Sequence, residues 1–333
     1  MELNDLKASI TRCSQPMVGI KQKRSIQDEK LIEAIFQSND ENLEKVHLII
    51  DARPSMNAMA NQALGAGTES LDNYKNCERK FMNIENIHVM RKSLGKFVEA
   101  IQSPDHGIDK FYDLIDRSGW LKHIKYLMEA NDIIIEYILA GKNVLVHCSD
   151  GWDRTAQLTS LAELCLDPFY RTIKGFQILI EKEWISFGHK FNDRCGHDCI
   201  KIYTPNSAKE KMKRGKSKEV APIFHQFLEC TFQLISQFPH EFEFNIKYLV
   251  ELFDNVYSCQ FGTFLLNNEK QRIDCDLRGR TNSLWSNLDK RRAGFLNENY
   301  SQTLVILRPK VHPSHLKLWK ELYLRHEDFQ QKQ

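Results

Sequence analysis

The sequence contains no apolar run long enough to cross a membrane. Its longest apolar stretches, residues 132–140 and 303–307, are short or interrupted by charged side chains, whereas a spanning helix needs about 20 consecutive apolar residues. The N-terminal region also lacks the apolar core of a secretory signal. These absences predict a chain with neither a transmembrane helix nor a signal peptide, and they favour a cytoplasmic location.

The charge balance shows little excess of either sign. With 46 Lys and Arg against 44 Asp and Glu, the formal net charge is +2, which gives no indication of nucleic acid as a partner. A strongly basic stretch lies at residues 209–218. It is typical of a solvated loop, and its alternative role is electrostatic contact with anionic lipid headgroups.

Disulfide chemistry is not indicated either. The chain has nine cysteines, and without a secretory signal these are expected to remain reduced thiols. Cys195 and Cys199, with His197 between them and His189 upstream, are ligand types for zinc, but their spacing is not a common zinc pattern. The sequence therefore predicts no metal site and no cofactor.

The apolar residues that are present are enough for a sizeable core. They make up 42% of 333 residues, a length that suits one large α/β domain or two small ones. Apolar residues at helical spacing predict helices over residues 28–37, 121–139, 155–166, 223–235 and 249–257. Short β-rich runs predict strands over 46–50 and 143–146, and two glycines between helical patterns predict a loop over 63–69.

One segment places a cysteine, five residues and an arginine between a strand and a helix. Cys148 follows the predicted strand 143–146, and Arg154 directly precedes the predicted helix 155–166. Backbone N–H groups of such a loop converge on an oxyanion, and the helix dipole adds positive potential at the same point. The segment therefore predicts a phosphate-binding loop. The spacing by itself also fits a buried core cysteine followed by a surface arginine.

The same residues supply the chemistry of phosphoryl transfer through a cysteine. The loop should lower the pKa of Cys148 and favour a thiolate nucleophile, and the Arg154 guanidinium can bind two phosphate oxygens at once. Asp150 and Asp153 also lie in the loop, where like charges beside a bound phosphate favour retention of a proton on one of them. Since the sequence lacks the Trp-Pro-Asp triplet that supplies the general acid in tyrosine phosphatases, the acid is expected from the loop itself, with Asp153 favoured.

The loop HCSDGWDRTAQ (147–157) resembles that of the myotubularin family, phosphatases of 3-phosphorylated phosphoinositides. Other segments resemble the family in the same order: ITRCSQPMVG (10–19), DARPSMNAMAN (51–61), NIHVMR (86–91), EKEWISFGH (181–189), QFPHEFEF (237–244) and FGTF (261–264). The resemblance covers roughly residues 9–325. It implies an α/β fold of the cysteine-dependent, protein-tyrosine-phosphatase-like type, enlarged as in myotubularins, with a central mixed sheet flanked by helices.

The resemblance also implies a domain organisation and a set of site residues. A single phosphatase domain is expected over residues 1–333, without the PH-GRAM domain or coiled coil of other members. Cys148 is the expected nucleophile, Arg154 the phosphate clamp, Asp153 the acid and Asp150 the group that orients water. Substrate contacts are expected from Asn61, Asn86, Ile87, Ser149, Asp150, Gly151, Trp152, Asp153, Arg154, Lys190 and Arg194.

Lys190 and Arg194 lie where the family has basic residues that bind the rest of the headgroup. Arg194 matches the common arginine, whereas Lys190 replaces the arginine of some members and keeps the charge without the two-pronged donor. Outside the family context, these two residues also fit a surface ion pair, Asn61 a turn amide, Asn86 a capping amide and Ile87 a core side chain.

The implied function is that of a phosphoinositide 3-phosphatase. It would hydrolyse phosphatidylinositol 3-phosphate, with the 3,5-bisphosphate as a further candidate, through a cysteinyl-phosphate. Its partner is the headgroup at a membrane surface, so transient binding to endosomal-type membranes is expected, and no oligomeric state is predicted. One alternative is a protein tyrosine phosphatase, which the acidic loop disfavours. Another is a catalytically weak phosphoinositide-binding scaffold, a class that loses the loop cysteine or arginine, whereas Cys148 and Arg154 are present.

Overall fold

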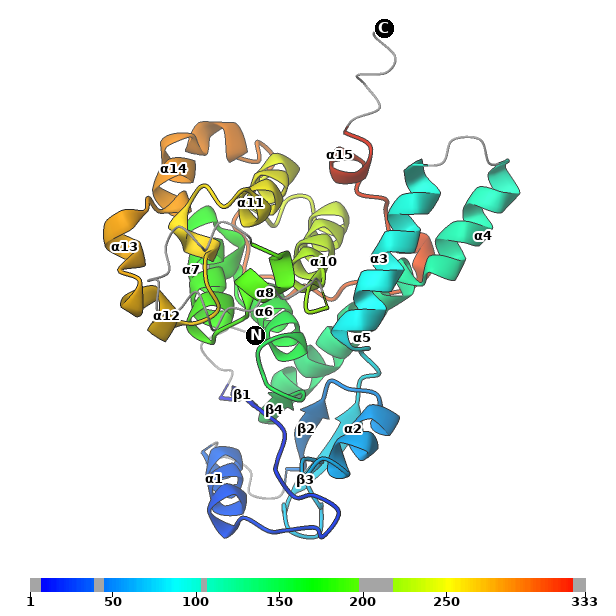
Figure 1. Cartoon of the computed structure of the whole chain (residues 1–333), viewed down its shortest axis with the longest axis vertical. Coiled ribbons are helices and arrows are strands. Elements are labelled where there is room, and N and C mark those ends of the chain that lie inside the picture. The colour runs from blue at the N-terminus through cyan, green and yellow to red at the C-terminus, as the bar shows by residue number, and fades with distance from the viewer. Residues whose placement is uncertain (1–6, 39–44, 103–106, 198–217, 326–333) are drawn as a thin grey trace, which may run out of the picture. The chain divides into compact units, whose positions relative to one another are not determined.

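The computed structural model describes residues 7–38, 45–102, 107–197 and 218–325 (Figure 1). The chain divides into two compact units. Unit 1 comprises residues 1–85, 126–167 and 304–308, and unit 2 comprises residues 86–125, 168–303 and 309–333. Each unit is therefore assembled from segments that are far apart in the sequence. Of the basic stretch 209–218, all but Lys218 lies outside the described residues.

Unit 1 contains a four-stranded sheet in the order β1-β4-β2-β3 (Figure 1). The strands are β1 (Ile10–Cys13), β2 (His47–Asp51), β3 (Cys77–Phe81) and β4 (Val144–His147). The expected central sheet is confirmed, but the expectation that it is mixed is wrong, because every pairing of these strands is parallel. β2 and β4 are buried along their whole length, which explains their nearly unbroken apolar sequences.

The strand register brings the ends of three strands to one edge of the sheet. Cys13 of β1 and Asp51 of β2 both pair with His147 of β4. Residues that directly follow these strands in the sequence therefore meet at the same edge. In open parallel sheets, ligands bind outside the carboxyl ends of the strands.

The helices of unit 1 include those that the spacing of apolar residues predicted, and they add α2, which was not predicted. They are α1 (Ile26–Gln37), α2 (Ser55–Gln62) and α6 (Arg154–Leu166), while α5 (Trp120–Leu139) runs through both units. Their bounds agree with the predicted helices 28–37, 121–139 and 155–166 to within two residues. The buried side chains of α1 pack on the sheet in a cluster of Ile32, Phe36, Ile49, Tyr74 and Leu145. The predicted loop 63–69 contains no helix or strand.

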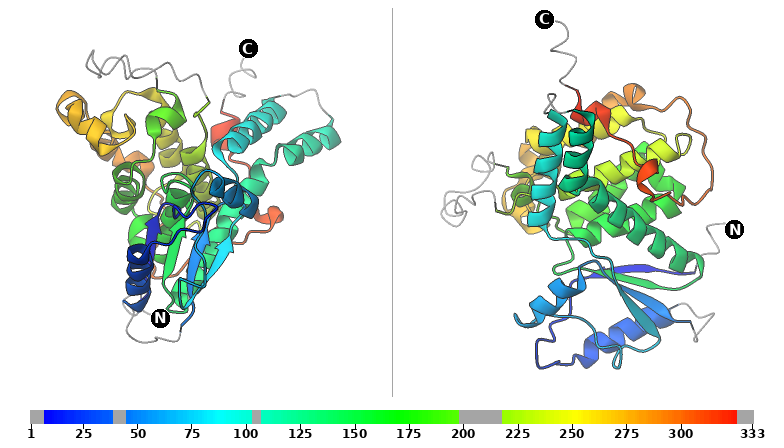
Figure 2. Two further views of the ribbon diagram at one scale, coloured as in Figure 1. Left: turned by 60° about the horizontal axis from the view of Figure 1, so that its bottom comes forward. Right: turned by 90° about the vertical axis from the view of Figure 1, so that its right-hand side faces the viewer.

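Unit 2 is mainly helical, and α3 and α4 lie side by side in both views of Figure 2. Its helices are α3 (Ile87–Gln102), α4 (Ile108–Ser118), α7 (Ile173–Ile180), α8 (Phe191–Cys195), α10 (Ile223–Gln237), α11 (Ile246–Ser258), α12 (Glu269–Asp274), α13 (Leu277–Arg280), α14 (Leu284–Lys290) and α15 (Lys320–Tyr323), with a π-helical turn at Glu181–Ser186. α10 and α11 confirm the helices predicted at 223–235 and 249–257.

The aromatic stripe of α10 forms core. Phe224 and Phe227 pack against Trp184 of the π-helical turn, with ring centroids 4.9 and 5.2 Å from the indole. Phe191 of α8 and Phe264 extend the same cluster. Across the described ranges, no helix is both long and apolar enough to span a bilayer.

Candidate active site

The position of Cys148 is set by the central strand of unit 1. β4 is flanked by β1 and β2, and Cys148 is the first residue after it. The thiol is buried, and the following residues form a short loop that ends where α6 begins at Arg154. The structure thus contains the predicted order of strand, loop and helix N-terminus.

The loop is held in shape by the segment that follows β1. The N–H of Gln15 donates to the Ser149 carbonyl at 3.2 Å, and Arg12 Nη2 donates to the Gly151 carbonyl at 2.5 Å. Gly151 has φ +85°, and a Cβ at this position would lie 2.7 Å from the carbonyl oxygen of Cys13. Only glycine fits both the conformation and the space.

The loop environment lowers the pKa of the Cys148 thiol. Burial on its own raises this pKa, but the positive charge of Arg154 and the donors of the loop, among them the Gly151 N–H, outweigh it. The Gly151 N–H lies 3.3 Å from Cys148 Sγ. A lowered pKa favours the thiolate form of Cys148, which is the form that the predicted nucleophile requires.

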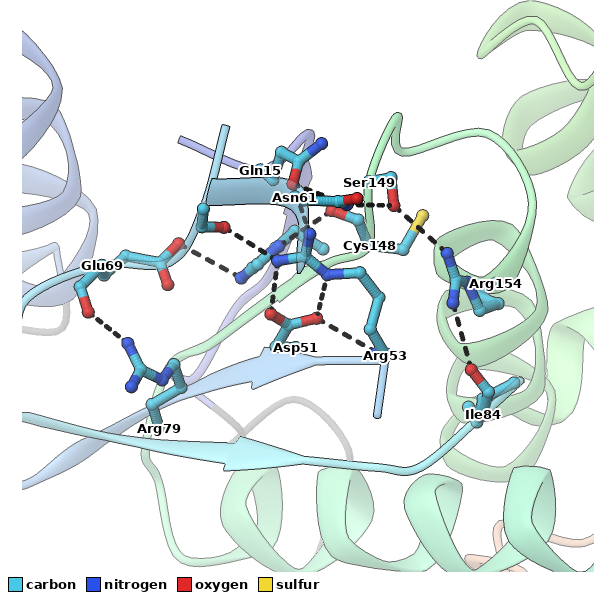
Figure 3. A network of polar contacts seen from close by, with 12 residues as sticks. Gln15, Asp51, Arg53, Asn61, Glu69, Arg79, Ile84, Cys148, Ser149 and Arg154 are labelled. Carbon is cyan, nitrogen blue, oxygen red and sulfur yellow. Dashed lines mark hydrogen bonds and ion pairs between the residues drawn. The ribbon is translucent and has the colours of Figure 1, made fainter. Parts of the chain in front are cut away.

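The Arg154 guanidinium is oriented by two hydrogen bonds. Nη1 donates to the Ile84 carbonyl at 3.1 Å, and Nη2 donates to Ser149 Oγ at 3.3 Å (Figure 3). Because a guanidinium is planar, these two bonds fix the plane in which its donors lie. The group is placed to stabilise negative charge developing at the thiol and at a phosphate bound over the loop.

The two loop carboxylates have different surroundings. Asp150 is exposed, whereas Asp153 is buried at the N-cap position of α6. The Asp153 side chain makes no capping hydrogen bond to the helix, although aspartate at this position commonly does so. Asp153 is five residues after Cys148 in the sequence, and its burial shields the carboxyl group from bulk water. A shielded carboxyl group suits a proton donor.

Beneath the loop lies a buried ion pair. Arg53 Nε donates to Asp51 Oδ1 at 2.8 Å, Arg53 Nη2 donates to Asp51 Oδ2 at 2.6 Å, and both side chains are fully buried. Arg53 Nη2 also donates to the Gly67 carbonyl at 2.9 Å. This two-pronged pair joins the end of β2 to the loop predicted over 63–69.

A polar chain connects this ion pair to the phosphate-binding loop (Figure 3). Gln15 Oε1 accepts from Arg53 Nη1 and, at 3.3 Å, from Asn61 Nδ2. Asn61 Nδ2 also lies 3.3 Å from Ser149 Oγ, which in turn accepts from Arg154. The structure thus brings the predicted Asn61 to the loop. It adds Gln15 and Arg53, which sequence reasoning missed.

A second buried ion pair involves His147, the residue that precedes Cys148. His147 Nε2 is 3.1 Å from Glu69 Oε1, and His147 Nδ1 is 3.1 Å from the Cys148 carbonyl oxygen. Burial alone would lower the pKa of His147, but the Glu69 carboxylate raises it to about 9. The pKa of Glu69 is lowered, since His147 and Arg79 outweigh its burial. His147 is therefore a cation near neutral pH. Glu69 was also missed, although it lies in the predicted loop.

Asn86 and Ile87 belong to unit 2, at the start of α3. Asn86 Oδ1 accepts from the backbone N–H of His88 at 3.0 Å and of Val89 at 3.2 Å. Asn86 is thus the capping amide of α3, one of its two expected uses. Its role in substrate binding, and that of Ile87, stay predictions.

Lys190 and Arg194 also belong to unit 2, around α8. Arg194 is buried, and its Nη1 donates to Glu219 Oε2 at 3.0 Å and to the Glu219 carbonyl at 3.2 Å. Lys190 is half-buried at the N-cap of α8. Arg194 thus forms an ion pair, which was the alternative expected for it, but it does so at a buried position. Contact of Lys190 or Arg194 with the headgroup stays a prediction.

The zinc-type residues near α8 have other contacts. His197 Nε2 lies 2.6 Å from the Val256 carbonyl oxygen, and burial raises the pKa of the Cys195 thiol. In the part of the chain that the structure describes, no group of three or more His, Cys, Asp or Glu side chains could hold a metal ion. Cys199 lies outside that part.

The parallel sheet and the cysteine–arginine loop at a helix N-terminus define the fold class of the cysteine-dependent phosphatases. Residues 3–273 match the description "Myotubularin-like phosphatase domain". The chain belongs to this family.

Curated relatives share this similarity over nearly the whole chain. The chain is 47% identical over 321 residues to phosphatidylinositol-3,5-bisphosphate 3-phosphatase MTMR8 of Homo sapiens, covering 96% of this chain and 43% of the relative. It is 46% identical over 330 residues to phosphatidylinositol-3-phosphate phosphatase MTMR7 of Mus musculus, covering 97% and 47%. It is 44% identical over 321 residues to phosphatidylinositol-3,5-bisphosphate 3-phosphatase MTMR6 of Mus musculus, covering 95% and 49%. The chain spans about half the length of these relatives.

Proposed function

We propose that this chain is a phosphoinositide 3-phosphatase that works through a cysteinyl-phosphate. The observation that carries the proposal is the geometry of the loop, in which the Gly151 N–H lies 3.3 Å from Cys148 Sγ and Arg154 begins α6. The lowered pKa of the Cys148 thiol agrees with this arrangement. A thiolate, an oriented guanidinium and a helix N-terminus in one loop are the parts that phosphoryl transfer to cysteine requires.

In the first step, the Cys148 thiolate attacks the phosphorus of the bound phosphate. A P–S bond forms, and the bond between phosphorus and the inositol oxygen breaks. Asp153 gives its proton to the leaving alkoxide, which is a poor leaving group without it. Arg154 and the loop N–H groups stabilise the charge on the equatorial oxygens.

In the second step, water hydrolyses the cysteinyl-phosphate. Asp150 orients the water, and the Asp153 carboxylate takes a proton from it, so that Asp153 returns to its starting state. The P–S bond breaks, inorganic phosphate leaves, and Cys148 is released as thiolate. No group beyond the side chains of the loop takes part in the proton balance.

The substrate class is supported by the relatives. Their printed names specify phosphatidylinositol 3-phosphate for MTMR7 and the 3,5-bisphosphate for MTMR6 and MTMR8. We infer that both lipids are candidate substrates here, and that Lys190 and Arg194 bind the headgroup beyond the 3-phosphate. We also propose that the chain is one phosphatase domain and that it works in the cytoplasm, transiently at endosomal-type membranes. The family resemblance is the support for these two points.

Phosphate release from short-chain phosphoinositide isomers tests the proposal. Isomers with a 3-phosphate should be hydrolysed, and Cys148→Ser should abolish turnover while keeping fold and binding, because a hydroxyl is a poor nucleophile without a base. A chelator should leave the rate unchanged. Near-normal turnover by Cys148→Ser would overturn the mechanism.

Two outcomes would redirect the assignment. Faster turnover of a phosphotyrosine peptide than of every lipid isomer would favour a tyrosine phosphatase. Tight binding of 3-phosphorylated lipids without phosphate release by the wild type would favour a scaffold.

A further inference from the structure

Large apolar side chains stand in solvent around α2 of unit 1. Leu64 is 84% exposed, Met56 79%, Ile20 74%, Met17 70% and Met59 69%. Among the described residues, these are five of the six most exposed large apolar side chains. Single exposed apolar residues are normal, but a group of them marks an interaction surface. We call these five residues the apolar rim.

The members of the apolar rim come from two segments that are joined by backbone contacts. The N–H of Gly19 donates to the Ala66 carbonyl at 3.0 Å. A Cβ built on Gly67 would lie 2.7 Å from the side chain of Val18 and 2.9 Å from that of Gln62. The turn that carries Met17 and Ile20 therefore lies against the end of α2 and the residues beside Leu64. Figure 2 draws α2 beside the segment between β1 and α1.

α2 turns its large apolar side chains to solvent, which is the opposite of the usual arrangement. Met56 and Met59 are three residues apart and share one face, and both are exposed. Ala58 and Asn61 share another face, where Ala58 is buried and Asn61 lies within hydrogen-bond distance of Ser149. Helices of globular proteins normally turn the apolar face inward. The helix thus directs its polar amide to the candidate site and its methionines to solvent.

The charges of the two segments have one sign. Residues 14–24 contain Lys21, Lys23 and Arg24 but no acidic residue, and residues 55–67 contain no charged residue. Arg24 is paired with Glu29, whereas Lys21 and Lys23 are exposed. An anionic surface that approaches the apolar rim therefore meets lysines and no carboxylate from these segments.

We propose that the apolar rim inserts into the headgroup region of an anionic phospholipid bilayer. The positive charge of the segment that carries Met17 and Ile20 complements an anionic interface, and flexible apolar side chains can adapt to a fluid one. Gln15 and Asn61 link the rim segments to Ser149, so insertion brings the phosphate-binding loop to the lipid headgroups. This inference builds on the proposed function, but the rim can bind vesicles whether or not catalysis occurs.

The experiment compares wild type with the triple variant Met56→Ser/Met59→Ser/Leu64→Ser. Vesicles of phosphatidylcholine with phosphatidylserine, free of phosphorylated inositol lipids, report binding by flotation. Long-chain phosphatidylinositol 3-phosphate in such vesicles and its short-chain soluble form report turnover. The variant should lose about tenfold or more in vesicle affinity and vesicle turnover, because three exposed apolar side chains are removed. Its turnover of the soluble form should equal that of the wild type.

Two matched variants serve as controls. Ile108→Ser removes an equally exposed apolar side chain from α4 in unit 2 and should change neither binding nor turnover. Lys21→Gln/Lys23→Gln should weaken binding to phosphatidylserine vesicles by about tenfold and leave binding to pure phosphatidylcholine unchanged. Lys30→Gln, an exposed lysine on α1, should have a smaller effect than this pair.

Three results would overturn the inference. The triple variant could keep full vesicle affinity, or lose turnover of both substrates equally. It could also shift a wild-type dimer to monomer without changing vesicle binding, which would identify the rim as a contact between copies. If the wild type hydrolyses no short-chain isomer but the rim variants lose vesicle binding, the proposed function fails and the rim inference stands.

Discussion

Asp150 and Asp153 are the two carboxylates of the loop between β4 and α6, and their different exposure supports the different roles proposed for them. Asp150 faces solvent, where water is abundant, and Asp153 is buried at the start of α6. A general acid must keep its proton until the leaving group needs it, and a shielded carboxyl beside a bound dianion meets this requirement better than an exposed one.

Asp153→Asn should reduce turnover of the lipid by about 10²–10⁴, the usual contribution of general acid catalysis. The loss should be much smaller for an aryl phosphate, whose leaving group needs no proton. The measurement is kcat for both substrates with wild type and variant. Equal losses would mean that Asp153 maintains the loop structure, and Asp150 would then be the better candidate for the acid.

Lys190 and Arg194 differ in their burial around α8. Arg194 is buried and forms an ion pair with Glu219, and Lys190 is half-buried at the N-cap position of the helix. Lys190→Ala should lower use of the 3,5-bisphosphate by about tenfold or more, the worth of one charge-assisted hydrogen bond. Use of the 3-monophosphate should fall less, because the loop around Cys148 still binds its phosphate. The ratio of kcat/KM values for the two lipids is the readout.

Lys190→Arg is the matched variant, and it should keep or improve turnover of the bisphosphate because two donors replace one. If Lys190→Ala lowers both substrates equally, the lysine supports the loop or the shared phosphodiester. Selectivity would then have to come from Arg194 or from another residue.

At the scale of elements, alanine substitution at two helical glycines of unit 2 should change the stability of the fold in opposite directions. A Cβ on Gly175 in α7 would lie 1.8 Å from the carbonyl oxygen of Phe169. A Cβ on Gly95 in α3 would have no atom within 4 Å other than those of its chain neighbours and the backbone of its own helix. Gly175→Ala should destabilise the fold by about 1–3 kcal/mol or more, through overpacking. Gly95→Ala should stabilise it by about 0.5–1 kcal/mol, because alanine loses less backbone entropy in a helix. Denaturant midpoints measure both, and a destabilised Gly95→Ala would contradict the helical environment of α3.

The long helices could be predicted because the spacing of their apolar residues is a local pattern in the sequence. α5 buries side chains at helical spacing. α6 and α10 are buried on almost every face, polar residues included, but the apolar residues of their sequences still recur at that spacing. β1 and β3 could not be predicted in this way. Their sequences, ITRC and CERKF, carry charged residues and are mostly only half-buried, so they become strands through pairing with β4 and β2.

The candidate site also has a part that a local sequence pattern predicts and a part that depends on strand pairing. The loop from Cys148 to Arg154 is contiguous, so its chemistry could be predicted from one segment. The contacts of Gln15, Arg53 and Glu69 depend on a register that no local pattern specifies. A usable signal was nonetheless present, since polar residues that directly follow parallel strands meet at one edge. Applied to Asp51, this rule would have found Arg53.

At the scale of the whole molecule, the buried pair of His147 and Glu69 makes stability depend on pH. The pKa of His147 is raised from 6.5 to about 9 in the folded state. Its contribution is therefore fully present below pH 6.5 and is lost as the pH rises through about 9. The pKa of Glu69 is lowered from 4.5, so its contribution is present above that value and is lost on further acidification.

Glu69→Gln removes the anionic partner and should flatten this dependence. Between pH 6.5 and 9 the wild type should lose on the order of 3 kcal/mol of unfolding free energy relative to the variant. Urea unfolding at several pH values measures the difference between the two proteins, which cancels groups that titrate alike in both. A parallel decline in wild type and Glu69→Gln would show that the pair does not hold the proton.

The position of β4 between β1 and β2 has a consequence for folding during synthesis of the chain. The contact between Ser9 and Asn143 that aligns β1 with β4 spans 134 positions of the chain, so β1 and β2 are synthesised long before the strand that joins them. A nascent chain that ends within α5 therefore exposes unpaired strand edges, which favour wrong association and slow productive folding. Cys148, the proposed nucleophile, is synthesised directly after β4, which is the last of the four strands in sequence. A ribosome-bound fragment that ends within α5 consequently lacks the whole segment from Cys148 to Arg154, and this loop can take its place only after β4 has joined the sheet.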